Sequence, residues 1–118
     1  MTRKILIVED SPTVLAVLKD AFLAEGCDVV VAVNGDEAIA KAASEKPELV
    51  VLDTVLPDID GLEVCRKIKE NLKGTKIIIM TGVVDAVDAT KARDAGADDY
   101  CVKTSDYEFL LQTARKFL

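Results

Sequence analysis

Residues 49–53 read Leu-Val-Val-Leu-Asp, four apolar residues followed directly by a carboxylate. An unbroken apolar run of this kind is typical of a parallel strand that is buried on both of its faces. Runs of similar character occupy residues 5–8, 29–33 and 77–80, and a shorter, mixed run occupies residues 100–102. We therefore predict five strands, of which the quoted segment is the third.

Helix signals fill the intervals between these runs. Ser11 is placed to cap a helix whose first position is Pro12, and Gly26 is placed to end it. Asn34 begins a second helix, which runs to about Ser44. Three further helices are predicted at residues 62–72, at residues 84–95, and from a capping box formed by Ser105 and Glu108 to residue 117.

Five strands that alternate with five helices predict an α/β fold, a parallel sheet with helices on both faces. The doubly wound, flavodoxin-like order 2-1-3-4-5 fits five such units, and we take it from known folds of this kind rather than from the spacing. No linker, repeat or low-complexity segment divides the chain. We therefore expect residues 1–118 to form a single domain.

The composition excludes several functional classes. A net charge of −6, with no basic run longer than two residues, argues against direct nucleic-acid binding. No apolar stretch approaches the ~20 residues that span a bilayer, so we expect a cytoplasmic protein without membrane contact. The absence of histidine excludes histidine catalysis and a phosphohistidine on this chain. The cysteines Cys27, Cys65 and Cys101 lack metal-ligand spacing and are expected to be buried free thiols.

Polar residues follow the apolar runs at the point where each strand ends. Glu9 and Asp10 follow the first strand, and Asp53 ends the third. Thr81 ends the fourth strand and Lys103 the fifth. In the predicted order these positions meet at one edge of the sheet, where ligands bind in folds of this class. Grouped carboxylates repel one another, and an oxygen-only ligand set without histidine or cysteine indicates Mg²⁺ or Mn²⁺.

An incomplete carboxylate site of this kind suits a phosphoryl-transfer centre. Asp53 is the natural nucleophile, since carboxylates form acyl phosphates in other proteins. Lys103 and Thr81 are placed to contact the oxygens of the transferred group. Any one of these residues at a strand end is more often a cap, a turn residue or a solvated side chain. The prediction therefore depends on their joint placement.

Four stretches carry a resemblance to a known family. They read Ile-Leu-Ile-Val-Glu-Asp at 5–10, Leu-Val-Val-Leu-Asp-Thr-Val-Leu-Pro-Asp-Ile-Asp-Gly at 49–61, Ile-Ile-Ile-Met-Thr-Gly at 77–82 and Gly-Ala-Asp-Asp-Tyr-Cys-Val-Lys at 96–103. Each is moderately specific alone, and all four in this order and spacing are very specific. On these motifs the chain resembles a receiver domain of the two-component response regulators, similar to the chemotaxis regulators, over essentially all 118 residues.

The resemblance implies that Asp53 is the phosphoacceptor. A sensor histidine kinase or a phosphotransfer protein would pass the phosphoryl group to it from a phosphohistidine. Glu9, Asp10, Asp53 and the backbone carbonyl of Val55 would hold Mg²⁺, with Mn²⁺ as a substitute. The protein would be a signalling switch that catalyses only its own phosphorylation and slow dephosphorylation, and not a metabolic enzyme.

The resemblance also implies how the switch works. Thr81 would be the switch hydroxyl, and Lys103 would contact the phosphoryl group. Tyr100 falls where the family places an aromatic residue that turns inward once Thr81 has moved; an aromatic packed at the sheet edge is the simpler alternative. The surface of the fourth helix, fifth strand and fifth helix would then change shape for a downstream effector, an attached output domain or a second copy in a homodimer.

Two departures from the family pattern bear on function. Thr104 stands where the family usually has a proline, often after a cis bond, and a cis bond before another residue costs about 2.5–4 kcal/mol. We therefore expect a differently shaped loop before the last helix. Val55 and Val83 stand where family members often carry polar residues that position attacking water, so we expect a comparatively long-lived aspartyl phosphate.

Two other functional classes are alternatives. A small aspartate-based phosphatase commonly needs a second Asp two residues after its nucleophile, and here that position is Val55. A receiver-like binding module that is never phosphorylated typically lacks one of the site residues, whereas all of them are present here. Both alternatives are therefore weaker than the phosphorylation switch.

Overall fold

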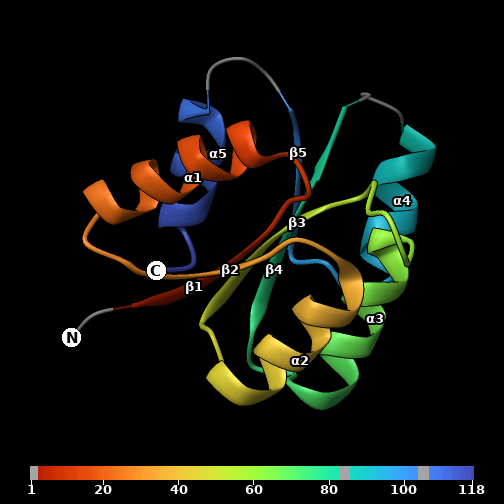
Figure 1. The fold of residues 1–118 in the computed structure, drawn as a ribbon. Coiled ribbons are helices and arrows are strands. Elements are labelled where there is room, and N and C mark those ends of the chain that lie inside the picture. Colours follow the sequence, from red (N-terminus) through yellow and green to blue (C-terminus); the bar gives the residue numbers. More distant parts are fainter. Residues whose placement is uncertain (1–2, 83–85, 104–106) are drawn as a thin grey trace.

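The computed structural model describes residues 3–82, 86–103 and 107–118, which form five strands and five helices (Figure 1). The strands are β1 Lys4–Val8, β2 Asp28–Ala32, β3 Leu49–Asp53, β4 Lys76–Thr81 and β5 Asp99–Val102. The helices are α1 Pro12–Ala24, α2 Gly35–Glu45, α3 Gly61–Asn71, α4 Ala86–Asp94 and α5 Glu108–Arg115. The strands are parallel and lie in the order β2-β1-β3-β4-β5, which confirms the predicted topology. Within the described ranges, no helix is long and apolar enough to cross a membrane.

The helix signals in the sequence mark the ends of α1 and α2. The Ser11 hydroxyl accepts a hydrogen bond from the Val14 amide at 3.4 Å, as expected of a cap. Gly26 follows α1 with a φ of 83°, a left-handed conformation that favours glycine. The Asn34 side chain accepts a hydrogen bond from the Glu37 amide at 2.8 Å and so caps α2. These local signals are confirmed.

The predicted bounds of the last two helices agree less well with the structure. The predicted start of the fourth helix, Val84, and the predicted cap of the fifth, Ser105, lie outside the described residues. The described helices begin at Ala86 and at Glu108. The fifth helix was predicted to reach residue 117 but ends at Arg115, because the last turn closes through tighter i to i−3 backbone bonds.

The strand side chains alternate between two apolar layers. Leu6 and Val50 belong to the layer that α2, α3 and α4 cover, whereas their neighbours Ile7 and Val51 belong to the layer that α1 and α5 cover. Figure 1 shows these two groups of helices on opposite faces of the sheet. Both faces of the central strands are therefore buried, which explains their unbroken apolar runs.

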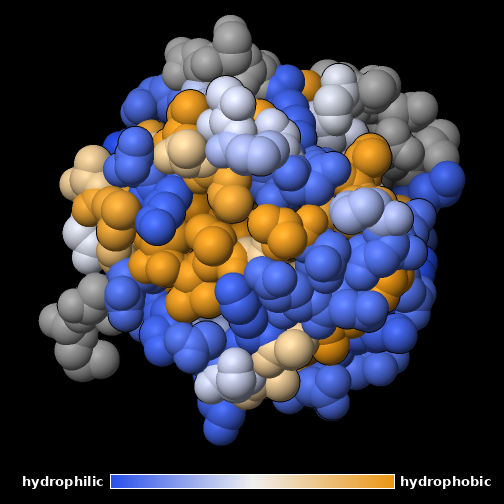
Figure 2. All heavy atoms as spheres, viewed as in Figure 1, coloured by the Kyte–Doolittle hydropathy of each residue, from blue (hydrophilic) through white to orange (hydrophobic). Residues whose placement is uncertain are grey.

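β2 is an edge strand, and a lysine covers part of its outer edge. The Ala32 carbonyl accepts a hydrogen bond from the Glu9 amide at 3.0 Å on the β1 side, so the preceding carbonyl of Val31 faces outward. The Lys41 ammonium donates to the Val31 carbonyl at 2.5 Å. Figure 2, in the same view as Figure 1, shows apolar side chains gathered on the side of the molecule where α1 and β2 lie. A charge at this edge opposes pairing with a further strand.

The carboxyl ends of β1, β3, β4 and β5 share one edge of the sheet. By strand alternation, Glu9, Asp53 and Lys103 continue the face of the sheet that α1 and α5 cover. Thr81 continues the opposite face, which α4 covers in part. The fold therefore divides the predicted site residues between the two sides of one sheet edge.

Candidate functional site

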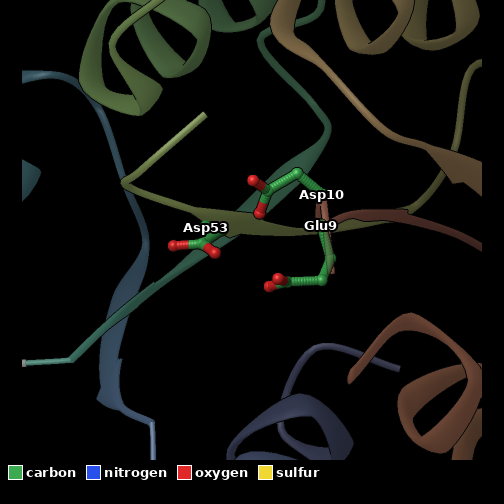
Figure 3. Close-up of side chains that lie close together, drawn as sticks. All are labelled: Glu9, Asp10 and Asp53. Carbon is green, nitrogen blue, oxygen red and sulfur yellow. The ribbon is translucent and has the colours of Figure 1, made fainter. Parts of the chain in front are cut away.

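Three carboxylates from two neighbouring strands converge at this edge. Glu9 and Asp10 follow β1, and Asp53 ends β3. One oxygen of each lies within 4.8 Å of those of the other two, and Figure 3 shows the three side chains turned toward one another. Glu9 and Asp53 are buried, whereas Asp10 is exposed. The structure thus brings together the three carboxylates that the sequence singled out.

The Lys103 ammonium pairs with both buried carboxylates. Its Nζ lies 2.6 Å from Asp53 Oδ2 and 2.9 Å from Glu9 Oε2. The backbone amide of Lys103 donates to the Thr81 carbonyl at 2.6 Å, which ties the residue after β5 to the end of β4. The Lys103 side chain is 25% exposed, so it can meet an incoming anion without first leaving the protein interior.

The lysine does not neutralise three carboxylates. Burial and the neighbouring Asp53 carboxylate raise the pKa of Glu9 to about 7, although Lys103 and the Ser11 amide favour its charged form. Burial opposes the charge on Lys103, but its hydrogen-bonded ion pair with Asp53 and its ion pair with Glu9 together raise its pKa. Near neutral pH, Glu9 is therefore poised between its protonated and charged forms while Lys103 stays charged.

One buried oxygen in the site lies in an ion pair, but nothing in the described part of the chain hydrogen-bonds to it with acceptable geometry. Glu9 Oε1 accepts a hydrogen bond from the Ser11 amide at 3.1 Å. Glu9 Oε2 is close to Lys103 but accepts no hydrogen bond of acceptable geometry within the described part of the chain. Buried polar atoms are rarely left in this state. A divalent cation would satisfy this oxygen, and the all-oxygen donor set suits Mg²⁺ or Mn²⁺.

The loop after β3 folds back on the Asp53 carboxylate. The Val55 amide donates to Asp53 Oδ1 at 3.1 Å, and the Val55 side chain is exposed. The Gly61 amide donates to the Thr54 carbonyl at 3.1 Å and closes the loop. A Cβ at Gly61 would lie 2.7 Å from Thr54 Cα and still closer to the Asp53 carbonyl oxygen. This approach of α3 to the end of β3 therefore requires glycine.

Thr81 and Tyr100 share a pocket beside the carboxylates. Its volume is about 190 Å³, and its other lining residues are Thr54, Asp60, Leu62 and Lys91. Thr81 is buried, and Tyr100 is half-buried and packs against the α2–α4 layer. The two residues predicted to act as the switch are thus brought to one space, next to the residue that follows Asp53.

Three further residues bear on the site: two were predicted from the sequence, and one was not. Val83 and Thr104 lie outside the described residues, so the expectations based on them stay predictions. Sequence reasoning treated Ser11 only as a helix cap and missed its amide as a partner of Glu9. The available signal was its position directly after the two carboxylates of the first strand end.

The chain matches a known family and its members. Residues 5–115 match the family described as Response regulator receiver domain. Response regulator ArlR of Staphylococcus saprophyticus is 42% identical over 115 residues, which cover 98% of this chain and 52% of that protein. The alkaline phosphatase synthesis transcriptional regulatory protein PhoP of Bacillus subtilis is 38% identical over 103 residues, which cover 87% of this chain and 43% of that protein. The chain thus spans about half the length of these curated relatives.

A solved structure agrees with this match. The crystal structure of response regulator protein TrrA from Thermotoga maritima, in complex with Mg²⁺ and BeF, matches with a TM-score of 0.91 and 35% identity. The match covers 99% of this chain and 100% of that chain. The likeness therefore extends over the whole sheet and both helix layers.

Proposed function

The chain belongs to the response regulator receiver domain family, and from this premise we propose that residues 1–118 act as one receiver domain whose phosphoacceptor is Asp53. The phosphoryl group comes from a phosphohistidine of a sensor histidine kinase or of a phosphotransfer protein. The domain is a phosphorylation switch of two-component signal transduction rather than a metabolic enzyme. Its own catalysis is limited to its phosphorylation and slow dephosphorylation.

The transfer is a displacement at phosphorus. A carboxylate oxygen of Asp53 forms the new P–O bond while the P–N bond of the donor breaks, and the imidazole nitrogen keeps the bonding electron pair. The Val55 amide and the Lys103 ammonium, at 3.1 Å and 2.6 Å from the two carboxylate oxygens, fix the orientation of Asp53. Lys103 then pairs with a phosphoryl oxygen and offsets its charge.

Glu9, Asp10, Asp53 and the backbone carbonyl of Val55 are the groups that would hold Mg²⁺, with Mn²⁺ as a substitute. When bound, the cation supplies positive charge that neutralises and orients the phosphoryl oxygens. Among the described residues Glu9 Oε2 accepts no hydrogen bond of acceptable geometry, and this and the closeness of the three carboxylates support the assignment. The relative TrrA was crystallised in complex with Mg²⁺ and BeF.

The switch uses Thr81 and Tyr100. The phosphoryl group adds about −1.5 to −2 of charge and strong acceptor oxygens, and the Thr81 hydroxyl moves to donate to one of them. Tyr100 then turns into the space that Thr81 leaves. The pocket of about 190 Å³ that both residues line supports this rearrangement. The surface of α4, β5 and α5 changes shape as a result.

The partners follow from that surface. A downstream effector, an attached output domain or a second copy in a phosphorylation-dependent homodimer would read it. PhoP of Bacillus subtilis is a transcriptional regulatory protein, and the net charge of −6 here favours protein partners over direct nucleic-acid binding by this domain. We place the protein in the cytoplasm, where buried free thiols such as Cys27, Cys65 and Cys101 stay reduced.

The contact of Lys103 with Asp53 beside two further carboxylates carries the proposal. To test it, the protein is incubated with acetyl phosphate and Mg²⁺, and the intact mass is followed. We expect one stable phosphoryl group on the wild type and none on Asp53→Asn. Rapid release of phosphate would instead favour the phosphatase, and no reaction at all would favour the binding module.

A further inference from the structure

Asp58, in the loop between β3 and α3, caps a helix that precedes it in the chain by more than twenty residues. Its Oδ1 accepts a hydrogen bond from the Gly35 amide at 2.7 Å, and its Oδ2 accepts one from the Asp36 amide at 3.0 Å. These are the first two amides of α2. Asn34, the local cap, takes only the next amide, that of Glu37. The start of α2 is therefore held in part by the loop that follows Asp53.

This contact is close and charged. A Cβ at Gly35 would lie 2.9 Å from Val64 Cγ2 and 3.2 Å from Asp58 Oδ1, so glycine permits the approach of α2 to the loop. The hydrogen bonds from the Asp36 and Gly35 amides lower the pKa of Asp58. An ionised carboxylate at a helix N-terminus also interacts favourably with the helix dipole. The cap is therefore fully formed at neutral pH.

The loop that Asp58 holds also carries Val55. Its first anchor is the hydrogen bond from the Val55 amide to Asp53 Oδ1, and its last is the bond from the Gly61 amide to the Thr54 carbonyl. Asp58 is the anchor between these two. The position of the Val55 carbonyl thus depends on bonds on both sides of it, one to β3 and one to α2.

We propose that Asp58 is a positioning residue for the metal site, which through its double cap on α2 holds the loop and the Val55 carbonyl in the arrangement that binds a divalent cation. This inference rests on the proposed function, in which Val55 supplies a ligand. Asp58 acts through the backbone and touches neither the cation nor the phosphoryl group. Because coupling between two events is reciprocal, cation binding also tightens the first turn of α2.

The test compares two variants that remove caps from the same helix. Asp58→Ala removes the cap from the loop, and Asn34→Ala removes the local cap, whose side chain bonds Glu37 rather than the loop. Each loss of a cap costs about 1 kcal/mol of stability, so stability alone does not separate them. The readouts are amide hydrogen exchange in the metal-free protein and the Kd for Mg²⁺ by calorimetric titration.

In Asp58→Ala we expect faster exchange at the Val55 and Gly61 amides and a Kd for Mg²⁺ that rises about fivefold or more. Asn34→Ala should leave both readouts close to those of the wild type. Asp58→Asn, which keeps one acceptor oxygen, should give intermediate exchange rates and an intermediate Kd. It replaces Asp58→Ala in the test if Asp58→Ala does not fold. Added Mg²⁺ should slow exchange at the Gly35 amide of the wild type.

Two results overturn the inference while leaving the proposed function intact. The first is that Asp58→Ala binds Mg²⁺ with the same Kd as the wild type and exchanges its Val55 amide at the same rate. The second is an equal change in Asn34→Ala, which would mean that any weakening of α2 has the same effect. A wild-type protein that does not bind Mg²⁺ would overturn the proposed function, and this inference with it.

Discussion

Lys103 Nζ lies 2.6 Å from Asp53 Oδ2, although 50 residues separate the two in the chain. The contact joins the ends of β3 and β5 across β4, because parallel strands bring their carboxyl ends to one edge of the sheet. The same ammonium pairs with Glu9. One lysine therefore compensates two buried carboxylates, and its removal is the first test of the site.

Lys103→Met leaves Asp53 and Glu9 without their counter-ion. We expect the free energy of unfolding of the metal-free protein to fall by about 1–3 kcal/mol, less than for a fully buried pair because the lysine is 25% exposed. Phosphorylation by acetyl phosphate should slow by about tenfold or more. Urea unfolding and mass spectrometry measure the two effects. The control is Lys116→Met, whose exposed pair with Asp99 at 3.8 Å should contribute little, and equal effects would contradict the assignment.

Asp10→Asn should stabilise the metal-free protein and weaken its binding of Mg²⁺. The substitution removes one of three mutually repelling carboxylates, so we expect the free energy of unfolding to rise by about 0.5–1 kcal/mol. The Kd for Mg²⁺ should rise about tenfold or more, since ligand charge sets the affinity. Asp20→Asn, at an exposed position on α1, is the matched control. Unchanged Mg²⁺ binding in Asp10→Asn would remove this residue from the ligand set.

The stability of the metal-free protein should fall as the pH rises toward and through 7. The pKa of Glu9 is about 7 in the folded protein against an ordinary 4.5, so the folded state binds the proton more tightly. The stability contributed by this group is fully present below pH 4.5 and is lost as the pH rises through 7, a change of at most about 3 kcal/mol. Urea unfolding between about pH 5 and pH 8 measures it.

Mg²⁺ should reverse this dependence, because it binds the charged form of Glu9. Its affinity should therefore decrease as the pH falls below 7, where Glu9 takes up a proton. Glu9→Gln is the control, and it should flatten the pH dependence of the metal-free protein. A slope that persists in Glu9→Gln would assign the titration to another group.

Gly61→Ala should be strongly destabilising. The added Cβ would lie 2.7 Å from Thr54 Cα and closer still to the Asp53 carbonyl oxygen, both backbone atoms that cannot move freely. We expect a loss of about 2–4 kcal/mol in the free energy of unfolding. Gly74→Ala is the matched control, since nothing lies within 4 Å of its Cβ position and its φ is not in the left-handed region. Similar losses in the two variants would contradict the steric account.

Val55→Asn should shorten the lifetime of the aspartyl phosphate, because a polar side chain there can position attacking water. Val55 is exposed beside Asp53, so the substitution has space, and we expect hydrolysis to speed up about threefold or more. Loss of label from the phosphorylated protein measures the lifetime. Val83→Glu, outside the described residues, is a second test of the same idea, and Val17→Asn on the surface of α1 is the control. Lifetimes equal to that of the wild type in both test variants would contradict the hypothesis.

Local patterns in the sequence predict much of the fold. The run at residues 49–52 became β3, Leu49–Asp53, and the other strands also lie within one residue of their predicted ends, because burial on both faces selects an unbroken apolar run. Ser11 and Asn34 cap the predicted helices through contacts within one turn. The order of the strands was taken from known folds, since local patterns do not state which strand lies beside which.

The sequence by itself also determined which side chains share the site. Glu9, Asp10, Asp53 and Lys103 stand at strand ends, and parallel strands end on one edge of the sheet. Only the tertiary structure decided how these groups are paired. The ion pair of Glu9 Oε2 with Lys103, the raised pKa of Glu9 and the cap that Asp58 places on α2 all depend on burial and on contacts between distant segments. The positions of residues along the chain determine which of them stand at the ends of strands. The charge balance and desolvation of these side chains depend instead on the groups that surround them in space.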